Sequence, residues 1–271
     1  MTYLFDPANW EWITAGNNLR YLLSGFLINI EIALIAMVLS LIVGLALALA
    51  RLSRNRLAAL VAGLWIDVWR NLPLIFIILY LALSIPESWR DAYVGLVPAT
   101  FPEAFRTPFI LAAIGGLTLY NSAVIAEIMR AGILSLERGQ SEAAQSLGMR
   151  YWQSMRLVIL PQGLRRMVPA TVSQLITLTK DTSLVSIIAI QEAIRRARIV
   201  TNTSGSPFVG LGVDAPLLHV FITVGMMFIL FNLMLSRLSK RLEIRERART
   251  GTKIRRVTGL EDQVAAEADV A

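Results

Sequence analysis

Long apolar stretches, separated by short charged clusters, constrain the fold of this chain more than any other feature. A helix needs about 20 consecutive apolar residues to cross the hydrocarbon core of a bilayer, and windows of that length recur along the 271 residues. Charged residues make up 17% of the chain, whereas soluble globular domains carry roughly 25%. The sequence therefore predicts an all-α, polytopic membrane protein.

We predict about five transmembrane spans. The second apolar region, at about 57–85, is too long for one straight span and is interrupted by Arg70-Asn71-Leu72-Pro73. Because proline removes a backbone donor and disfavours helix at the residue before it, we expect a helix up to Trp69, a break, and a span from Pro73. We expect the other spans at about 22–50, 109–133, 167–190 and 217–238, with an exposed loop at 86–108 and a second loop at 202–216.

The distribution of lysine and arginine predicts the orientation of these spans, because cytoplasmic loops carry an excess of positive side chains. Of the 26 lysines and arginines, 18 follow the first span, separate the third from the fourth, or follow the fifth, and six lie on the opposite side. We therefore expect the N-terminus outside and the C-terminus in the cytoplasm. The expected regions are an extracytoplasmic segment (1–21), a membrane domain (22–242) and a cytoplasmic tail (243–271).

The tail is basic up to Arg256 and acidic from Glu261, and we expect it to be partly disordered. Its basic part would lie on anionic membrane lipid. Topology and lipid attraction account for much of the net charge of +7, so we expect no nucleic-acid partner.

Composition excludes several kinds of catalytic site. The chain has no cysteine and a single histidine, His219. This excludes a thiolate site and a histidine-pair metal site, and a Ser-His-Asp triad could use only His219. An intramembrane enzyme would need catalytic groups facing one cavity, and the few intramembrane acids do not provide them. We therefore expect no catalytic residue and no metal, and we expect His219 to be solvated or interfacial.

A polar segment at about 135–166 lies between two long apolar runs. Good helix formers lead up to Gly148, and glycine is the usual residue at a helix C-terminus. Residues 149–159 have the periodicity of an amphipathic helix, which Pro161 would end. Two short helices joined at a glycine would form a compact knob.

The knob has the features of a docking surface. Small side chains at Ala143 and Ala144 would let another surface approach closely, and Glu142 would offer one charge to set the register. Because a short loop is enough to connect two spans, docking to a cytosolic partner is the more economical explanation of this segment.

The spacing of Glu142-Ala143-Ala144, Gly148 and Val158-Ile159-Leu160-Pro161 resembles the EAA loop in permease subunits of bacterial ATP-binding-cassette importers. Val158 stands where that family usually has isoleucine. The resemblance extends over about 22–242.

Three further motifs are similar to those of the polar amino-acid branch of that family. Lys180-Asp181-Thr182-Ser183-Leu184 matches its Lys-Asp-Thr-Ser-Leu element. Arg70-Asn71-Leu72-Pro73 resembles its Arg-Gly-Thr-Pro element, from which Asn71 and Leu72 depart. Leu119-Tyr120-Asn121-Ser122-Ala123, followed by Glu127 and Arg130, is similar to its third-helix pattern.

Polar residues within the spans are candidates for a substrate path. A charge at the centre of a span costs at least about 2.5–3.5 kcal/mol, so Lys180 and Asp181 either have a function or pair structurally. The hydroxyls of Thr182 and Ser183 could bind the carboxylate or the ammonium group of a zwitterion, although hydroxyls also form bonds between helices.

Two more pairs could line the same path. Arg70 and Asn71 lie at the proline break, where unwound backbone is tolerated only if it is buried in protein or lines a cavity. A kink at the membrane interface is the alternative for these two residues. Asn121 and Ser122 in the third span either line the cavity or pack between helices.

Glu127 and Arg130 lie near the cytoplasmic end of the third span. We expect them to form a structural or gate pair. Glu127 is also the alternative structural partner for Lys180.

The resemblance implies a type I importer permease in the bacterial cell membrane, without hydrolytic activity or a cofactor of its own. The implied partners are a second permease chain, identical or different, cytosolic ATPases that bind ATP and magnesium, and an extracytoplasmic binding protein. We expect glutamate or glutamine as substrate, with arginine, lysine or histidine as the alternative. An autonomous channel or secondary carrier is less favoured, because five spans cannot be halved into inverted repeats.

Overall fold

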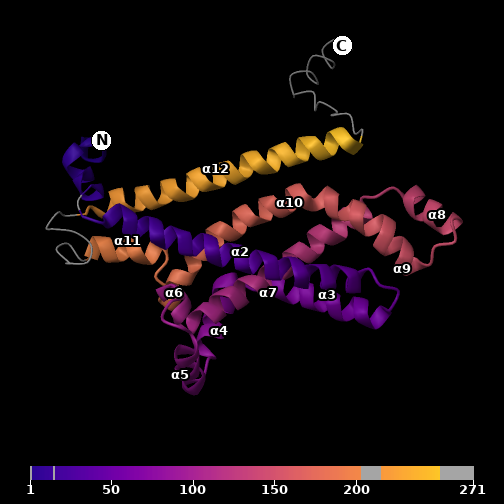
Figure 1. Cartoon of the computed structure of the whole chain (residues 1–271), viewed down its shortest axis with the longest axis horizontal. Helices are drawn as coiled ribbons and strands as arrows, with labels where there is room; N and C mark the ends of the chain where they lie inside the picture. Colours follow the sequence, from indigo (N-terminus) through magenta and orange to yellow (C-terminus); the bar gives the residue numbers. More distant parts are fainter. Residues whose placement is uncertain (1, 15, 203–214, 251–271) are drawn as a thin grey trace, which may run out of the picture.

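The computed structural model describes residues 2–14, 16–202 and 215–250, and every regular element in that part of the chain is helical. The longest helices, α2 (Asn18–Arg51) and α12 (Leu217–Thr250), run along the long axis of an elongated bundle (Figure 1). At its centre, α7 (Phe109–Leu134) packs against α2, α3 (Arg56–Asn71), α4 (Leu74–Leu83) and α10 (Leu160–Asp181).

Small residues bring the central helices close together. A Cβ atom at Gly44 of α2 would lie 2.7 Å from the side chain of Ile125 in α7, and one at Gly116 would lie 2.9 Å from Ile78 in α4. Close backbone approach at small residues is how helices associate in a membrane, where apolar side chains gain little by leaving lipid. These contacts hold α7 in the middle of the bundle.

Three described helices are long and apolar enough to cross a membrane: α2, α7, and α12 over Leu217–Glu246. The pair α3 and α4 is a fourth candidate, bent by 97° at its break. The break falls at Leu72 and Pro73, so the predicted interruption of the second apolar region is confirmed.

The predicted boundaries of the fourth span, 167–190, are wrong. The helix in this region, α10, begins at Leu160 and ends at Asp181, and a 3-10 segment, η3 (Thr182–Ile188), follows it. Ala189 then adopts a left-handed φ of 63°, and α11 (Ala193–Asn202) begins after this turn. Among the described helices α10 does not reach the apolarity that marks the three spans above.

Pro161 was expected to end a helix, and instead it lies in the first turn of α10. Proline is tolerated there because the first helical N–H groups have no partner within the helix. The preceding residues, α9 (Tyr151–Ser154) and the π-helical η2 (Met155–Ile159), lead into α10, and the Leu160 N–H donates to the Met155 oxygen. This wider turn gives the proline ring room where an α-helical carbonyl would clash.

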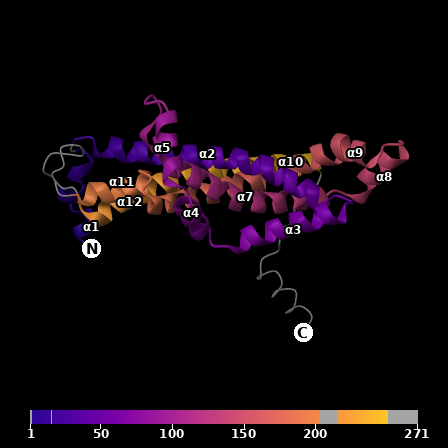
Figure 2. The ribbon, with the colours of Figure 1, turned by 90° about the horizontal axis from the view of Figure 1, so that it is seen from below.

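The connection predicted as an exposed loop at 86–108 contains two short helices, α5 (Glu87–Leu96) and α6 (Glu103–Arg106). Pro86 and Pro102 stand at their N-caps, where proline starts a helix rather than breaking one. None of the residues of α5 is buried, so its exposure is as expected. Figure 2 shows α5 projecting from one side of the bundle and α3 along the other.

His219 is buried rather than solvated, because the N-terminal elements α1 (Thr2–Phe5) and η1 (Pro7–Ile13) cover it. Its ring meets the edges of Tyr3 and Trp10, with centroids 5.3 and 4.7 Å away. At the other end of α12 the helix continues to Thr250, so residues 243–250 of the predicted tail are helical. The rest of that tail, and most of the predicted loop at 202–216, lie outside the described residues.

Candidate functional site

The polar segment at 135–166 contains the predicted short helix and glycine turn, but its second helix is not short, because α9 continues through η2 into α10. The first, α8 (Arg138–Ser146), is followed by Gly148 with a φ of 72°. The Gly148 N–H donates to the Gln145 oxygen (2.9 Å) and the Met149 N–H to the Ala144 oxygen (3.1 Å). This pair of bonds is the glycine-terminated motif that satisfies the last carbonyls of a helix. Figures 1 and 2 agree that α8 and α9 lie at one end of the bundle.

The outer surface of this segment is partly charged and partly apolar. Glu142 and Ala143 are exposed, but Ala144 is only 3% exposed and packs inward, so the expectation that both alanines face a partner is wrong for Ala144. Leu147 and Trp152 are 77% and 63% exposed. Sequence reasoning missed these two side chains, although large apolar residues in a polar segment could have indicated a docking surface.

Several hydrogen bonds fasten the segment to the ends of the bundle helices. The Tyr151 hydroxyl donates to the Leu52 oxygen (3.1 Å), and the Arg54 guanidinium lies 5.0 Å from the Tyr151 ring centroid. Arg166 donates to the Ser135 oxygen (2.7 Å). A cavity of about 430 Å³ with a mixed polar and apolar wall lies among these elements, and its wall includes Arg54, Gln145 and Tyr151. These contacts fasten the segment to the ends of α2 and α7.

The polar residues at the break between α3 and α4 face outward. Arg70 and Asn71 are both exposed, as is Pro73. The Asn71 side-chain amide donates to the Asp67 oxygen (2.7 Å) in its own helix. Asn71 therefore caps the end of α3 in this structure, and the Arg70 guanidinium beside the break makes no hydrogen bond or ion pair among the described residues.

Asn121 and Ser122 are fully buried in α7. The Asn121 amide donates to the Leu117 oxygen (2.9 Å), and its side-chain oxygen accepts from Gln174 in α10 (2.7 Å). The Ser122 hydroxyl donates to the Leu119 oxygen (2.9 Å). Asn121 thus connects α7 to α10 through Gln174, a partner that sequence reasoning missed.

Glu127 and Arg130 form the expected ion pair, with the guanidinium 2.8 Å from the carboxylate. Glu127 therefore does not pair with Lys180 among the described residues. Lys180 is exposed instead and lines a mainly apolar groove of about 400 Å³ between α10 and α12, whose other polar side chains are Asn232 and Ser236. Asp181 and Ser183 are half-buried.

Thr182 differs from its neighbours because it is fully buried and its hydroxyl is engaged. This hydroxyl donates to the Thr179 oxygen (2.7 Å) and accepts from the amide of Asn29 in α2 (3.1 Å). The same Asn29 amide donates to the Glu192 carboxylate (3.0 Å), and the Asn29 oxygen accepts from the Ala193 N–H (3.1 Å). We call Asn29, Thr182 and Glu192 the polar clasp.

Glu192 also begins α11. Its carboxylate accepts from the N–H groups of Ile194 (3.0 Å) and Arg195 (2.7 Å), which satisfies donors that a helix leaves open at its start. Sequence reasoning missed both Asn29 and Glu192. The one asparagine in the apolar run at 22–50 was the available signal.

The pattern of the family described as "Binding-protein-dependent transport system inner membrane component" matches residues 40–248. This chain belongs to that family. The permease is therefore a multi-pass protein of the bacterial cell membrane and a non-catalytic subunit, whose ATPase is a separate chain. The predicted all-α permease fold is confirmed.

Individual relatives agree with this assignment. A "Probable glutamine ABC transporter permease protein" of Bacillus subtilis is 35% identical over 231 residues, 84% of this chain and 95% of the relative. A glutamate/aspartate import permease protein of Escherichia coli is 36% identical over 196 residues, 72% of this chain and 84% of the relative. A solved structure described as an amino acid ABC transporter with histidines is 28% identical, with a TM-score of 0.66, and covers 84% of this chain and 94% of that one.

In the described part of the permease, no group of three or more histidine, cysteine, aspartate or glutamate side chains could hold a metal ion. Of the predicted path residues, Arg70, Lys180 and Asp181 form no ion pair in the described part of the permease, whereas Asn121 and Thr182 join helices through their side chains.

Proposed function

We propose that this permease is the membrane-spanning subunit of an ATP-driven importer for glutamate or glutamine. The names of its Bacillus subtilis and Escherichia coli relatives support this substrate class. The exposed ammonium of Lys180 in the groove beside α12 supports it as well, because a cation suits the carboxylates of an amino acid.

In this proposal the segment 135–166 docks to a cytosolic ATPase that holds ATP and magnesium. The observation that carries the proposal is the position of α8 and α9 at one end of the bundle, with Glu142, Ala143 and Leu147 exposed. Gly148 ends α8, and Leu160-Pro161 begins α10, so these residues set the shape of the surface. Closure of the ATPases on ATP would then favour one of two arrangements of the spans.

The complete transporter would contain a second permease chain, identical or different, and an extracytoplasmic binding protein. Five spans, with α10 as the fourth, would place the N-terminus outside and the tail (243–271) in the cytoplasm against lipid. Within the membrane domain (22–242), Arg70, Lys180, Asp181 and Ser183 would contact solute. The remaining path candidates would position helices; these are Asn71, Asn121, Ser122 and Thr182.

The test of docking is Glu142→Lys in the reconstituted transporter with its ATPase. We expect ATP-dependent uptake of labelled amino acid to fall at least about ten-fold, because a loss of about 1.4 kcal/mol at the interface is a factor of ten. Glu87→Lys, an exposed position on α5, is the matched control and should keep its uptake. Normal uptake with Glu142→Lys would overturn the docking assignment.

A basic amino acid is the second candidate substrate. The solved relative is described with histidines, and the half-buried carboxylate of Asp181 could hold a cation. Competition decides between the two: excess glutamate or glutamine should suppress uptake of labelled glutamate, and excess arginine or histidine should not. Suppression by arginine would reverse the ranking.

A further inference from the structure

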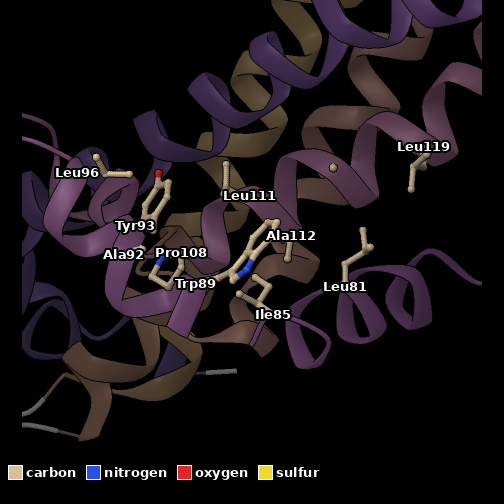
Figure 3. A pocket seen from close by; sticks show the side chains of 11 residues that line it. Leu81, Ile85, Trp89, Ala92, Tyr93, Leu96, Pro108, Leu111, Ala112 and Leu119 are labelled. Atoms are coloured by element: carbon tan, nitrogen blue, oxygen red, sulfur yellow. The ribbon is translucent and has the colours of Figure 1, made fainter. Parts of the chain in front are cut away.

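An apolar pocket of about 550 Å³, open on one side, lies between the end of α4, α5 and the first turns of α7 (Figure 3). It lies at the end of α7 opposite to the coupling segment 135–166, since that segment follows Leu134 and the pocket begins at Pro108. Its wall includes aliphatic and aromatic side chains from all three helices, among them Leu81, Ile85, Trp89, Tyr93 and Leu111.

The pocket does not suit a polar amino acid. The only polar side-chain atoms in its wall are the Trp89 indole N–H and the Tyr93 hydroxyl, and the hydroxyl donates to the Phe105 oxygen (2.8 Å). Burial raises the pKa of Tyr93, so this group stays neutral. A zwitterion would leave both of its charges without a partner here, which is costly in an apolar site. The occupant must therefore be apolar over most of its length.

The depth of the pocket corresponds to one leaflet of a bilayer. Along α7 its wall runs from Pro108 to Leu119, which at 1.5 Å per residue is about 16 Å, roughly half of the hydrocarbon core. Trp89 is 72% exposed and lies on the connection between two membrane segments, where tryptophan and tyrosine are enriched at membrane interfaces. The pocket thus spans from the interface towards the bilayer midplane.

A cation stands beside the interfacial end of the pocket. Arg90 donates from Nε to the oxygen of Ile85 (3.1 Å), a residue of the wall, and its guanidinium lies 5.8 Å from the ring centroid of Phe109. Its terminal N–H groups make no hydrogen bond to other residues in the described part of the chain. Guanidinium groups bind phosphate through paired hydrogen bonds.

We propose that this pocket binds one acyl chain of a membrane phospholipid, whose phosphate is held by Arg90. An acyl chain would match the apolar wall and the leaflet depth of the pocket. The phosphate would match the adjacent cation, at the level where the interfacial tryptophan lies. This site is independent of the amino-acid substrate and of the ATPase contact.

The test measures phospholipid retained by the intact transporter after purification from nanodiscs, by native mass spectrometry. Gly115→Leu fills the pocket: a Cβ there meets Leu81 at 3.7 Å, an ordinary contact, so no backbone needs to move. Gly225→Leu on α12 is the matched control, because a Cβ there meets nothing within 4 Å. We expect Gly115→Leu to lose the retained phospholipid and Gly225→Leu to keep it.

A second variant tests the phosphate contact without changing the pocket volume. Arg90→Gln should weaken lipid retention about five-fold, because one arginine near a membrane surface contributes about that factor. Arg106→Gln, an exposed arginine on the same connection, should leave retention unchanged. This comparison stands even if Gly115→Leu does not assemble.

Three results would overturn the proposal. The first is that the wild-type transporter retains no phospholipid. The second is that Arg90→Gln and Arg106→Gln retain equal amounts of phospholipid. The third is that a photoreactive side chain at Leu96 captures a second permease or the binding protein instead of lipid. Capture of lipid at Leu96 supports it, since Leu96 belongs to the pocket wall and is 80% exposed.

Discussion

At the scale of single residues, the side chain of Asn29 joins distant parts of the permease. Its one amide group reaches Thr182 at the end of α10 and Glu192 at the start of α11, and its oxygen accepts from Ala193. All three members of the polar clasp are fully buried. The turn that follows Lys180 and Asp181 is therefore fixed to α2 rather than to its sequence neighbours alone.

Replacing Asn29 should release this turn. Asn29→Leu would cost about 1–3 kcal/mol for each buried group left without a partner, so we expect a clearly lower unfolding temperature in detergent and a raised half-saturating substrate concentration. Leu27→Ala, at a 56% exposed position of the same helix, should change neither. An unaltered unfolding temperature for Asn29→Leu would show that the clasp does not stabilise the turn.

At the scale of elements, two glycines in the segment 135–166 allow the effect of a turn to be measured separately from the effect of helix propensity. Gly148 has a φ of 72°, whereas Gly139 lies inside α8, and an added Cβ would meet nothing within 4 Å at either position. Any difference between their alanine variants therefore comes from the backbone and not from crowding.

The two alanine variants should change stability in opposite directions. Gly148→Ala forces a left-handed conformation that costs about 1–2 kcal/mol, while Gly139→Ala should stabilise α8 by up to about 0.5–1 kcal/mol. Limited proteolysis of the segment, compared in the two variants, measures the difference. Equal protection would mean that α8 does not end at Gly148 in the assembled transporter.

At the scale of the whole molecule, the absence of cysteine from the sequence makes topology directly measurable. Glu87→Cys on α5 and Glu142→Cys on α8 each introduce one thiol at an exposed position. In intact cells an impermeant thiol reagent should label Glu87→Cys and not Glu142→Cys, and opening the cells should expose both. Labelling of Glu142→Cys from outside would reverse the proposed orientation.

Local signals explain which parts of the fold were predictable. Proline at 73 and glycine at 148 act on their own backbone, so the break after α3 and the end of α8 follow from sequence. The prediction that Pro161 ends a helix was wrong, because the effect of this proline depends on the wider turn before it. The clasp and the Gln174–Asn121 bond join residues more than 50 positions apart, and no local pattern contains such pairings. The burial of His219 depends likewise on the separate N-terminal elements.

The unbroken backbone from α9 through η2 into α10 has a mechanical consequence. Tyr151 and Asp181 are the two ends of 31 residues of continuous helix, about 45 Å long at 1.5 Å per residue. Such a rod turns as a lever, so a tilt imposed beside Trp152 swings the Lys180 end through an arc without any loop to absorb it. The backbone bonds of this rod are irregular at two places, the π turn at Met155–Ile159 and Pro169 inside α10, and the lever can flex at either of them.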